Sequence, residues 1–286
     1  MRKAALVLEG GSMRTLYTSG VLDVFMENNV EFELIVSVSA GALNGGNFVA
    51  KHIGRSAKIN ILHSNDSNYF GLRQLFLKGS IFNFDYLFYE PSKRLYPYDE
   101  NALINSKQRF LIGATNCKTG LCEYFEKYNY DDLAKVLQAS SSMPLLSKPM
   151  NLDGEMYLDG SIADPIPLQK AFSERYDKIV VVLTRDMDYK SKKPSLFIRT
   201  LYRIYSKKYP DLVKTLINRP NVYNSYADEI SRLEKDGKIF VFRPEKEVKV
   251  RKDEKDARKL LQLYFQGRDD AREKLEQMLI YIGGDL

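Results

Sequence analysis

The sequence predicts an α/β protein with a mostly parallel central sheet, and three observations support this fold class. Residues 4–8 and 34–36 are short apolar runs, each followed by a turn rich in glycine or serine and then by a segment compatible with a helix. A further apolar run lies at 178–183. Continuous apolar strands of this kind are typical of parallel sheets that helices cover on both faces. A length of 286 residues and a hydrophobic content of 44% suit a globular chain with a sizeable core.

The first strand–loop–helix unit carries a glycine-rich loop. The loop consists of Gly10, Gly11, Ser12, Met13 and Arg14. Such a loop at a helix N-terminus presents backbone N–H groups to an anion. One use is a phosphate cradle, although the loop lacks the Gly-Lys-Ser/Thr ending of a P-loop and the full Gly-x-Gly-x-x-Gly pattern. The other use is an oxyanion hole, where the anion exists only in the transition state.

The second unit places a serine at a sharp turn. The apolar run at 34–36 ends in Ser37-Val-Ser39-Ala-Gly41, and a helix-compatible segment follows. This is the layout of a nucleophile elbow, with Ser39 at the apex. Taken alone, such a turn is structural more often than catalytic. Parallel strands joined by right-handed crossovers bring both loops to the same edge of the sheet, so we expect Ser39 to face the glycine-rich loop.

A candidate carboxylate lies far downstream. Residues 109–115 and 121–125 read as a hairpin, and 131–138 read as a helix. Asp153-Gly154 then forms the centre of a second predicted hairpin, which is a turn signal. Asp159 comes where the second strand of that hairpin ends. A carboxylate at a strand end is well placed for a site, whereas one at a hairpin tip is not.

Two other segments have alternative interpretations. Aromatic residues are frequent in 69–88 and are expected either to line an apolar pocket or to pack on the sheet. Between Arg185 and Arg219 there are ten Lys or Arg against three Asp, with apolar residues interleaved. Such a segment either lies on an anionic membrane surface or forms a solvated helical face. We expect a strand at 239–242 and a pair of helices over 252–281 that is interrupted at Gly267.

Composition excludes some classes of partner and location. The 43 basic and 37 acidic residues give a net charge of +6, which suits anionic partners without indicating nucleic acid. No apolar run approaches the roughly 18 residues of a membrane-spanning helix, and the N-terminal run is too short for a signal peptide. Two cysteines favour a reducing compartment. We therefore expect a cytoplasmic protein, with peripheral contact at an anionic membrane surface as a further expectation.

The ordered motifs together resemble bacterial patatin-like phospholipases. The resemblance rests on the 10–14 loop, on Ser37 to Gly41 and on Asp159-Gly160-Ser161, which a Ser/Pro-rich stretch precedes. It implies a three-layer α/β/α fold with a mostly parallel central sheet. It also implies one patatin-like domain over 1–286, with catalytic motifs in 4–167 and a basic, helical portion from about 190.

The resemblance further implies an acyl hydrolase that cleaves fatty-acyl esters of lipids through a Ser–Asp dyad and an acyl-enzyme. Ser39 would be the nucleophile and Asp159 its partner, with Ser37 and Gly41 supporting the elbow. The oxyanion hole would come from Gly10, Gly11, Ser12 and Met13, supported by Arg14. Neither a metal nor an organic cofactor is expected.

The motifs depart from the family pattern at four positions. Ser12, Thr15 and Ser37 stand where the family has glycine, and Ser161 stands where it has glycine or alanine. These departures leave two alternatives: an esterase or thioesterase for soluble acyl groups, or a catalytically weak lipid-binding scaffold. His52 and His63 both precede Asp159, whereas a standard hydrolase triad runs Ser, Asp or Glu, then His. The predicted site therefore uses no histidine.

Overall fold

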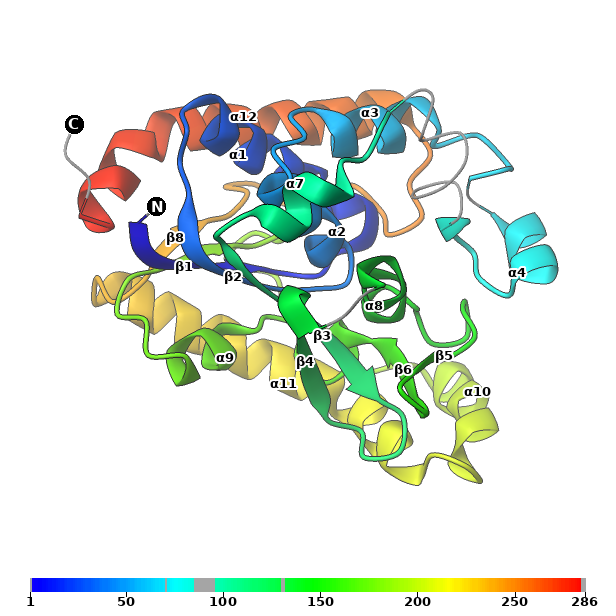
Figure 1. Ribbon diagram of the computed structural model, residues 1–286. Coiled ribbons are helices and arrows are strands. Elements are labelled where there is room, and N and C mark those ends of the chain that lie inside the picture. Colours follow the sequence, from blue (N-terminus) through cyan, green and yellow to red (C-terminus); the bar gives the residue numbers. More distant parts are fainter. Residues whose placement is uncertain (1, 70, 85–95, 130–131, 284–286) are drawn as a thin grey trace.

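A mostly parallel sheet lies between two layers of helices in the computed structural model, which describes residues 2–69, 71–84, 96–129 and 132–283 (Figure 1). The strand order is β5-β6-β3-β2-β1-β7-β8, with β4 also paired to β3. The pairs β1–β2, β1–β7, β2–β3 and β7–β8 are parallel, and the pairs made by β4, β5 and β6 are antiparallel. This arrangement confirms the predicted α/β/α fold.

The predicted strands form at the expected places. The described strands are β1 (Arg2–Leu8), β2 (Phe32–Val38), β3 (Arg109–Asn116), β4 (Cys122–Glu126), β5 (Met150–Leu152), β6 (Glu155–Asp159), β7 (Ile179–Val182) and β8 (Phe240–Phe242). Asp153 and Gly154 join β5 to β6 with φ of 51° and 88°. Positive φ at both central residues is what a tight hairpin turn requires, and it explains the Asp-Gly pair.

The helices fall into two layers and several shorter connecting pieces. Those before β3 are α1 (Leu16–Glu27), α2 (Ala40–Val49), α3 (Arg55–Leu62), α4 (Leu72–Lys78) and α7 (Glu100–Asn105). Those after β4 are α8 (Leu133–Ser140), α9 (Leu168–Ser173), α10 (Leu196–Ser206), α11 (Pro210–Lys235) and α12 (Ala257–Tyr281). Short 3₁₀ turns occupy Ser12–Thr15, Lys127–Asn129 and Gly160–Ile162. No helix within the described residues is long and apolar enough to cross a membrane.

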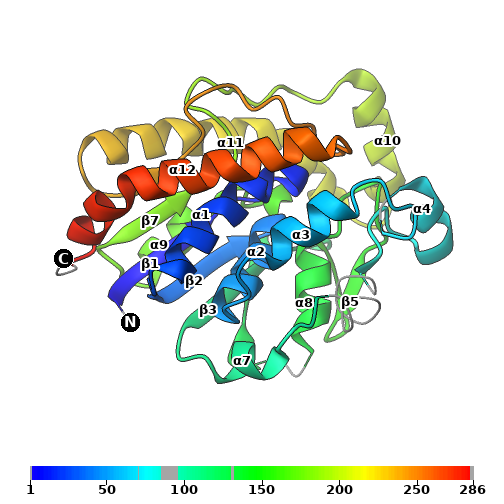
Figure 2. The ribbon, with the colours of Figure 1, turned by 90° about the horizontal axis from the view of Figure 1, so that it is seen from above.

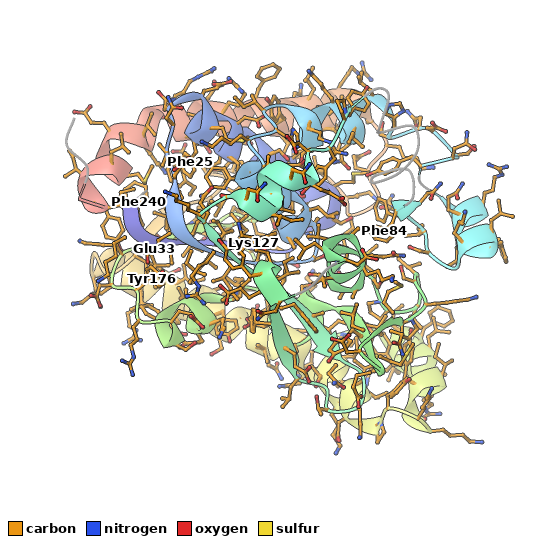
Figure 3. All side chains as sticks on the ribbon, viewed as in Figure 1. Phe25, Glu33, Phe84, Lys127, Tyr176 and Phe240 are labelled. Atoms are coloured by element: carbon orange, nitrogen blue, oxygen red, sulfur yellow. The ribbon has the colours of Figure 1, made fainter. Side chains whose placement is uncertain are left out.

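Strand β1 contributes to the core on both faces of the sheet. Leu6 and Leu8 pack in the cluster on the α1 and α12 side, whereas Ala5 and Val7 pack in the cluster on the α9 and α11 side. Figure 3 shows Phe25 on the first side and Tyr176 on the second. Because both faces are covered, the strand must be apolar throughout, which explains the continuous run in the sequence.

Strands β2 and β6 meet end to end along one edge of β3. Gly113 of β3 is paired with Val38 of β2, and the next residue, Ala114, is paired with Asp159 of β6. Strand β4 occupies the opposite edge, since it pairs with Ala114 as well. Ser39, which follows β2, and Asp159, the last residue of β6, are therefore brought together, because their strands pair with consecutive residues of β3.

The predicted interruption at Gly267 is wrong, because α12 runs unbroken from Ala257 to Tyr281. Figure 2 shows this helix lying alongside α1. A Cβ at position 267 would lie 2.1 Å from the main-chain oxygen of Tyr17 in α1. The glycine therefore serves the close approach of two helices rather than the end of one.

Candidate active site

Ser39 sits at the turn between β2 and α2 with an unusual backbone. Its φ of 57° and ψ of −137° lie in a region that non-glycine residues rarely adopt. Its N–H donates to Ser140 Oγ over 2.8 Å, and that hydroxyl in turn donates to the main-chain oxygen of Gly113 over 2.7 Å. Strain of this kind costs on the order of 1–3 kcal/mol and persists only where the surroundings hold it. Ser140 supplies one such restraint, which sequence reasoning missed.

Two residues before Ser39 the elbow accepts a serine, Ser37, whereas two residues after it the position of Gly41 requires glycine. A Cβ at Gly41 would lie 2.6 Å from the main-chain oxygen of Glu9, so this position requires glycine. Ser37 is fully buried in β2, where its hydroxyl is 3.4 Å from the main-chain oxygen of Leu111. The small polar side chain finds an acceptor in the neighbouring strand and does not disturb the sheet.

The Ser39 hydroxyl donates a hydrogen bond to the Asp159 carboxylate, with 2.6 Å between Oγ and Oδ2. The other oxygen of Asp159 accepts from both the N–H and the hydroxyl of Ser161, at 2.8 and 2.7 Å. Ser39 and Asp159 are 6% and 3% exposed. The structure thus brings together the two predicted catalytic residues, and it gives Ser161 the unforeseen task of orienting the carboxylate.

The glycine-rich loop passes directly over Ser39. A Cβ on Gly10 would lie 2.9 Å from the Cβ of Ser39. Within the described residues the N–H groups of Gly10 and Gly11 donate no hydrogen bond, whereas the N–H of Arg14 donates to Gly11 over 3.3 Å. Two main-chain donors of this loop, of which that of Gly10 lies against Ser39, therefore have no acceptor in the described part of the chain, and an oxyanion hole requires such donors.

The third position of this loop has a backbone conformation that favours glycine. Ser12 has φ of 53°, in the left-handed region that glycine adopts without a steric cost. Its hydroxyl donates to the main-chain oxygen of Lys252 over 2.7 Å. Serine at this position therefore ties the loop to a segment 240 residues away. Met13 beside it is buried in the core.

A buried carboxylate at the base of the loop was not singled out by sequence reasoning. Glu9 follows β1 and accepts a hydrogen bond from the N–H of Thr184 over 2.5 Å. Burial raises the pKa of Glu9, while this hydrogen bond and the charge of Arg14 act in the opposite direction. The side chain anchors the loop to the segment that follows β7. Its place directly before two glycines is the only signal in the sequence.

A cavity of about 70 Å³ opens beside Ser39. Its apolar lining includes Met13, Leu43, Ile59, Tyr69, Phe82, Phe84, Leu137 and Met143. Polar side chains, among them Asn44, Asn47 and Arg55, line it as well. Figure 3 shows Phe84 beside α8. The aromatic segment thus lines a pocket in part, although Phe76 is 87% exposed and does not. The aromatic residues Phe70, Tyr86 and Phe88, and Leu87 between the last two, lie outside the described residues.

The two histidines make contacts that do not involve the serine or the aspartate. His52 Nε2 accepts from the N–H of Asp99 over 2.9 Å, and burial lowers the pKa of this histidine. His63 faces the carboxylate of Asp66, with 3.7 Å between nitrogen and oxygen, and the ring of Tyr96. The geometry is therefore that of a serine–carboxylate pair beside main-chain donors.

Comparison with known proteins places these features in a family. The patatin-like phospholipase family matches residues 6–172, and a domain of unknown function, DUF6363, matches residues 209–283. An uncharacterized protein, YjjU, from Escherichia coli (strain K12) is 30% identical over 188 residues, which is 64% of this chain and 52% of that protein. The chain thus spans about half the length of that relative.

The crystal structure of VipD from Legionella pneumophila is similar over 97% of this chain and 67% of that one, with a TM-score of 0.49 and 12% identity. The family match covers both predicted loops and Asp159. The chain belongs to the patatin-like phospholipase family.

Proposed function

We propose that this protein is a serine acyl hydrolase that cleaves fatty-acyl esters of lipids. The observation that carries the proposal is the 2.6 Å hydrogen bond from Ser39 to Asp159, made beside a cavity with a partly apolar lining. Membership of a phospholipase family supports the same reaction.

In the proposed mechanism Asp159 accepts the proton of Ser39 as Oγ attacks the ester carbonyl. The loop amides of Gly10, Gly11, Ser12 and Met13 receive the oxyanion, and Arg14 supports the loop. Collapse of the intermediate expels the alcohol, which takes the proton from Asp159, and leaves the acyl group on Ser39. Water then attacks the acyl-enzyme with the same carboxylate as base. The fatty acid leaves as the proton returns to Ser39.

Ser37 and Gly41 support this site by holding the elbow. Ser161 holds the carboxylate so that one oxygen always faces Ser39, since it occupies the other with two hydrogen bonds. Every step uses side chains and main-chain groups of this chain, and no step requires a metal or an organic cofactor.

We also propose that residues 1–286 act as one patatin-like domain, with catalytic motifs in 4–167 and a basic helical portion from about 190. The close packing of α12 on α1 supports this proposal, since it joins the end of the chain to the helix that follows the glycine-rich loop. A domain held together in this way would fold and act as a unit.

We further propose a cytoplasmic protein that makes peripheral contact with anionic membranes. Helix α10 supports this idea, because Leu196, Phe197 and Ile204 are 79, 70 and 67% exposed on it. Arg199 and Arg203 lie among them. An amphipathic helix with exposed apolar and basic residues is suited to the interface of an anionic bilayer.

The decisive experiment is hydrolysis of an ester panel by purified wild type, by Ser39→Ala and by a matched control, Ser173→Ala. Ser173 is an exposed serine at the end of α9. The panel contains phospholipids, neutral acylglycerols, soluble short-chain esters and an acyl thioester. The proposal expects release of fatty acid from lipid esters by wild type and the control, and its loss in Ser39→Ala.

Other results of this panel would favour the alternatives. Turnover restricted to soluble esters or the thioester would indicate a soluble-substrate esterase. Absence of turnover by folded wild type on every substrate would indicate a lipid-binding scaffold. Retained turnover in folded Ser39→Ala would overturn the assignment of the nucleophile.

A further inference from the structure

Four cationic side chains lie close to one another, and two of them, Arg219 and Lys252, lie near Asp159 and Ser161. The four are Arg14 of the glycine-rich loop, Arg185 after β7, Arg219 of α11 and Lys252 before α12, and we call them the cationic cluster. Burial, and then repulsion from Arg185, lowers the pKa of Arg14 to about 10. Burial also lowers the pKa of Lys252 to about 8, and repulsion from the three arginines adds to this shift. Lys252 as a whole residue is exposed to solvent, and the repulsion from the three arginines places its ammonium end close to them.

The cationic cluster has donors without acceptors. Arg14 is 6% exposed, and its Nε has no hydrogen-bond partner within the described residues; the buried Nε of Arg185 has none either. In the described part of the chain, none of the four side chains makes an ion pair within 4.0 Å. A buried donor without a partner costs about 1–3 kcal/mol, and more when it is charged. An anionic acceptor at this place would remove that cost.

The two carboxylates nearest the cationic cluster, Glu9 and Asp159, accept hydrogen bonds from groups outside it. Glu9 accepts from the N–H of Thr184, and Asp159 accepts from Ser39 and Ser161. Arg219 donates the N–H of its Nε to the main-chain oxygen of Ser161 over 2.6 Å, which fixes its guanidinium to the segment that directly follows Asp159. Glu9 and Asp159 offset part of the positive charge of the cationic cluster, although neither makes an ion pair within 4.0 Å with it in the described part of the chain.

An open depression of about 660 Å³ lies on the side of the glycine-rich loop that carries Arg14. Arg14 and Arg185 line it together with residues 247–253, which we call the strap. The charged strap residues that line it are Glu247, Lys249, Arg251, Lys252 and Asp253. Arg251 and Asp253 neutralise each other through an ion pair of 2.9 Å. Cationic groups thus outnumber anionic ones in the depression.

The glycine-rich loop separates two environments around the dyad. Ser12 and Met13 line the cavity that contains Ser39, while Arg14 lines the cationic depression. The Ser12 hydroxyl also fastens the strap to the loop through the main-chain oxygen of Lys252. An ester bound at Ser39 would have a partly apolar cavity for its acyl chain and a positively charged region for its alcohol part.

We propose that the cationic cluster binds a phosphate group on the alcohol part of the acyl ester that Ser39 cleaves. This inference rests on the proposed function. A phosphate offers several acceptor oxygens, which suits guanidinium groups that approach from different segments. Arg219 and Lys252 lie within residues 209–283, the region that matches the domain of unknown function. That region would therefore select the substrate by its head group.

The first test compares two substrates with the same short acyl chain, a monoacylglycerol and the corresponding monoacylglycerol phosphate. We expect wild type to show a kcat/KM about tenfold or more higher for the phosphorylated ester, as charge-assisted hydrogen bonds of this kind allow. Lys252→Met and Arg185→Gln should each reduce the ratio of the two kcat/KM values severalfold. Lys235→Met is the matched control, because it removes the same charge from an exposed site at the end of α11.

The second test measures binding without turnover. Ser39→Ala is titrated calorimetrically with glycerol 3-phosphate, with inorganic phosphate and with glycerol. We expect glycerol 3-phosphate to bind, glycerol not to bind, and Lys252→Met in the same background to weaken binding about tenfold. If wild type cleaves neither ester, the proposed function fails, yet binding of glycerol 3-phosphate still tests the cationic cluster.

Three results would overturn the inference. One is a substrate ratio in Lys252→Met and Arg185→Gln equal to that of wild type. Another is an equal effect of Lys235→Met, which would indicate general attraction by net charge. The third is binding of inorganic phosphate without any preference for the phosphorylated ester, which would indicate a site for free phosphate rather than for a head group.

Discussion

Gly20 of α1 and Gly267 of α12 each lie against the backbone of the opposite helix. A Cβ at Gly20 would come within 2.1 Å of the main-chain oxygen of Tyr264, and one at Gly267 would come equally close to that of Tyr17. The same tyrosines reach across the crossing: Tyr17 donates to Asp270 and Tyr264 donates to Asp23, at 2.8 and 2.7 Å. The crossing fixes the C-terminal helix to the helix that follows the glycine-rich loop.

We predict that Gly267→Ala destabilises the protein although alanine is the better helix former. Propensity alone would favour alanine by about 1 kcal/mol in the middle of a helix. The new methyl group would clash with the Tyr17 backbone, and overpacking of this kind typically costs about 1–3 kcal/mol or more. Urea denaturation measures the difference, with Gln262→Ala on the exposed face of α12 as control. A stability at or above that of wild type would show that the helices adjust freely.

We predict that Asp164 makes the protein less stable as the pH rises from about 4 to about 6. Burial raises the pKa of Asp164 to about 6, although hydrogen bonds from Tyr124 and Tyr226 oppose this shift. The unfolded carboxyl has a pKa of about 3.9. The folded state therefore binds more protons than the unfolded state in this window, and the free energy of unfolding falls as the pH rises.

Asp164→Asn should remove this penalty. The free energy of unfolding of the variant relative to wild type should rise by roughly 1–3 kcal/mol between pH 4 and pH 7. Above pH 7 this difference should change little. Denaturation midpoints at several pH values measure the change, with Asp188→Asn at an exposed site as control. A difference between variant and wild type that stays constant with pH would contradict the prediction.

We predict salt-sensitive binding to vesicles that contain anionic lipid. Each Lys or Arg near such a surface contributes about 1 kcal/mol, and screening by salt removes this contribution. Vesicle sedimentation should show that Arg199→Gln with Arg203→Gln weakens binding to anionic vesicles. Leu196→Ser with Phe197→Ser should weaken it as well, whereas Ile280→Ser on α12 should not. Equal binding to neutral and anionic vesicles at low salt would leave α10 as a solvated helix.

We predict that catalysis does not depend on histidine. The double variant His52→Gln with His63→Gln should keep a kcat near that of wild type, because the contacts of both rings lie away from the dyad. Asp159→Asn should lose about 10²-fold to 10⁴-fold, since the general base is removed. Ester hydrolysis by both variants, with circular dichroism as the control for folding, provides the measurement. An inactive but folded histidine variant beside an active Asp159→Asn would contradict the mechanism.

Local patterns revealed the fold and much of the candidate site. Continuous apolar runs predicted strands buried on both faces, and a serine after one such strand identified the elbow. Asp159 stood out because it ends a strand, whereas Asp153 lies at a hairpin tip. These signals are readable because each depends on residues close together in the chain.

Long-range contacts could not be predicted in the same way. The alignment of β6 with β2 along β3 depends on pairings between distant segments. Ser140 restrains Ser39 across 101 positions, and Lys252 accepts from Ser12 across 240. Gly267 appeared to interrupt a helix because the sequence does not show which backbone lies against it. Each of these features depends on a partner that only the folded chain supplies.

The central claim is that Ser39 carries the acyl group during turnover. The most direct measurement is mass spectrometry of wild type quenched in acid during hydrolysis of a slow acyl ester, followed by peptide mapping. The proposed mechanism predicts an added acyl group on the peptide that contains Ser39, formed as fast as the alcohol is released. It also predicts little adduct in Asp159→Asn and none in Ser39→Ala. An acyl group on a different residue, or turnover by wild type without an adduct at Ser39 under conditions that make deacylation rate-limiting, would contradict it.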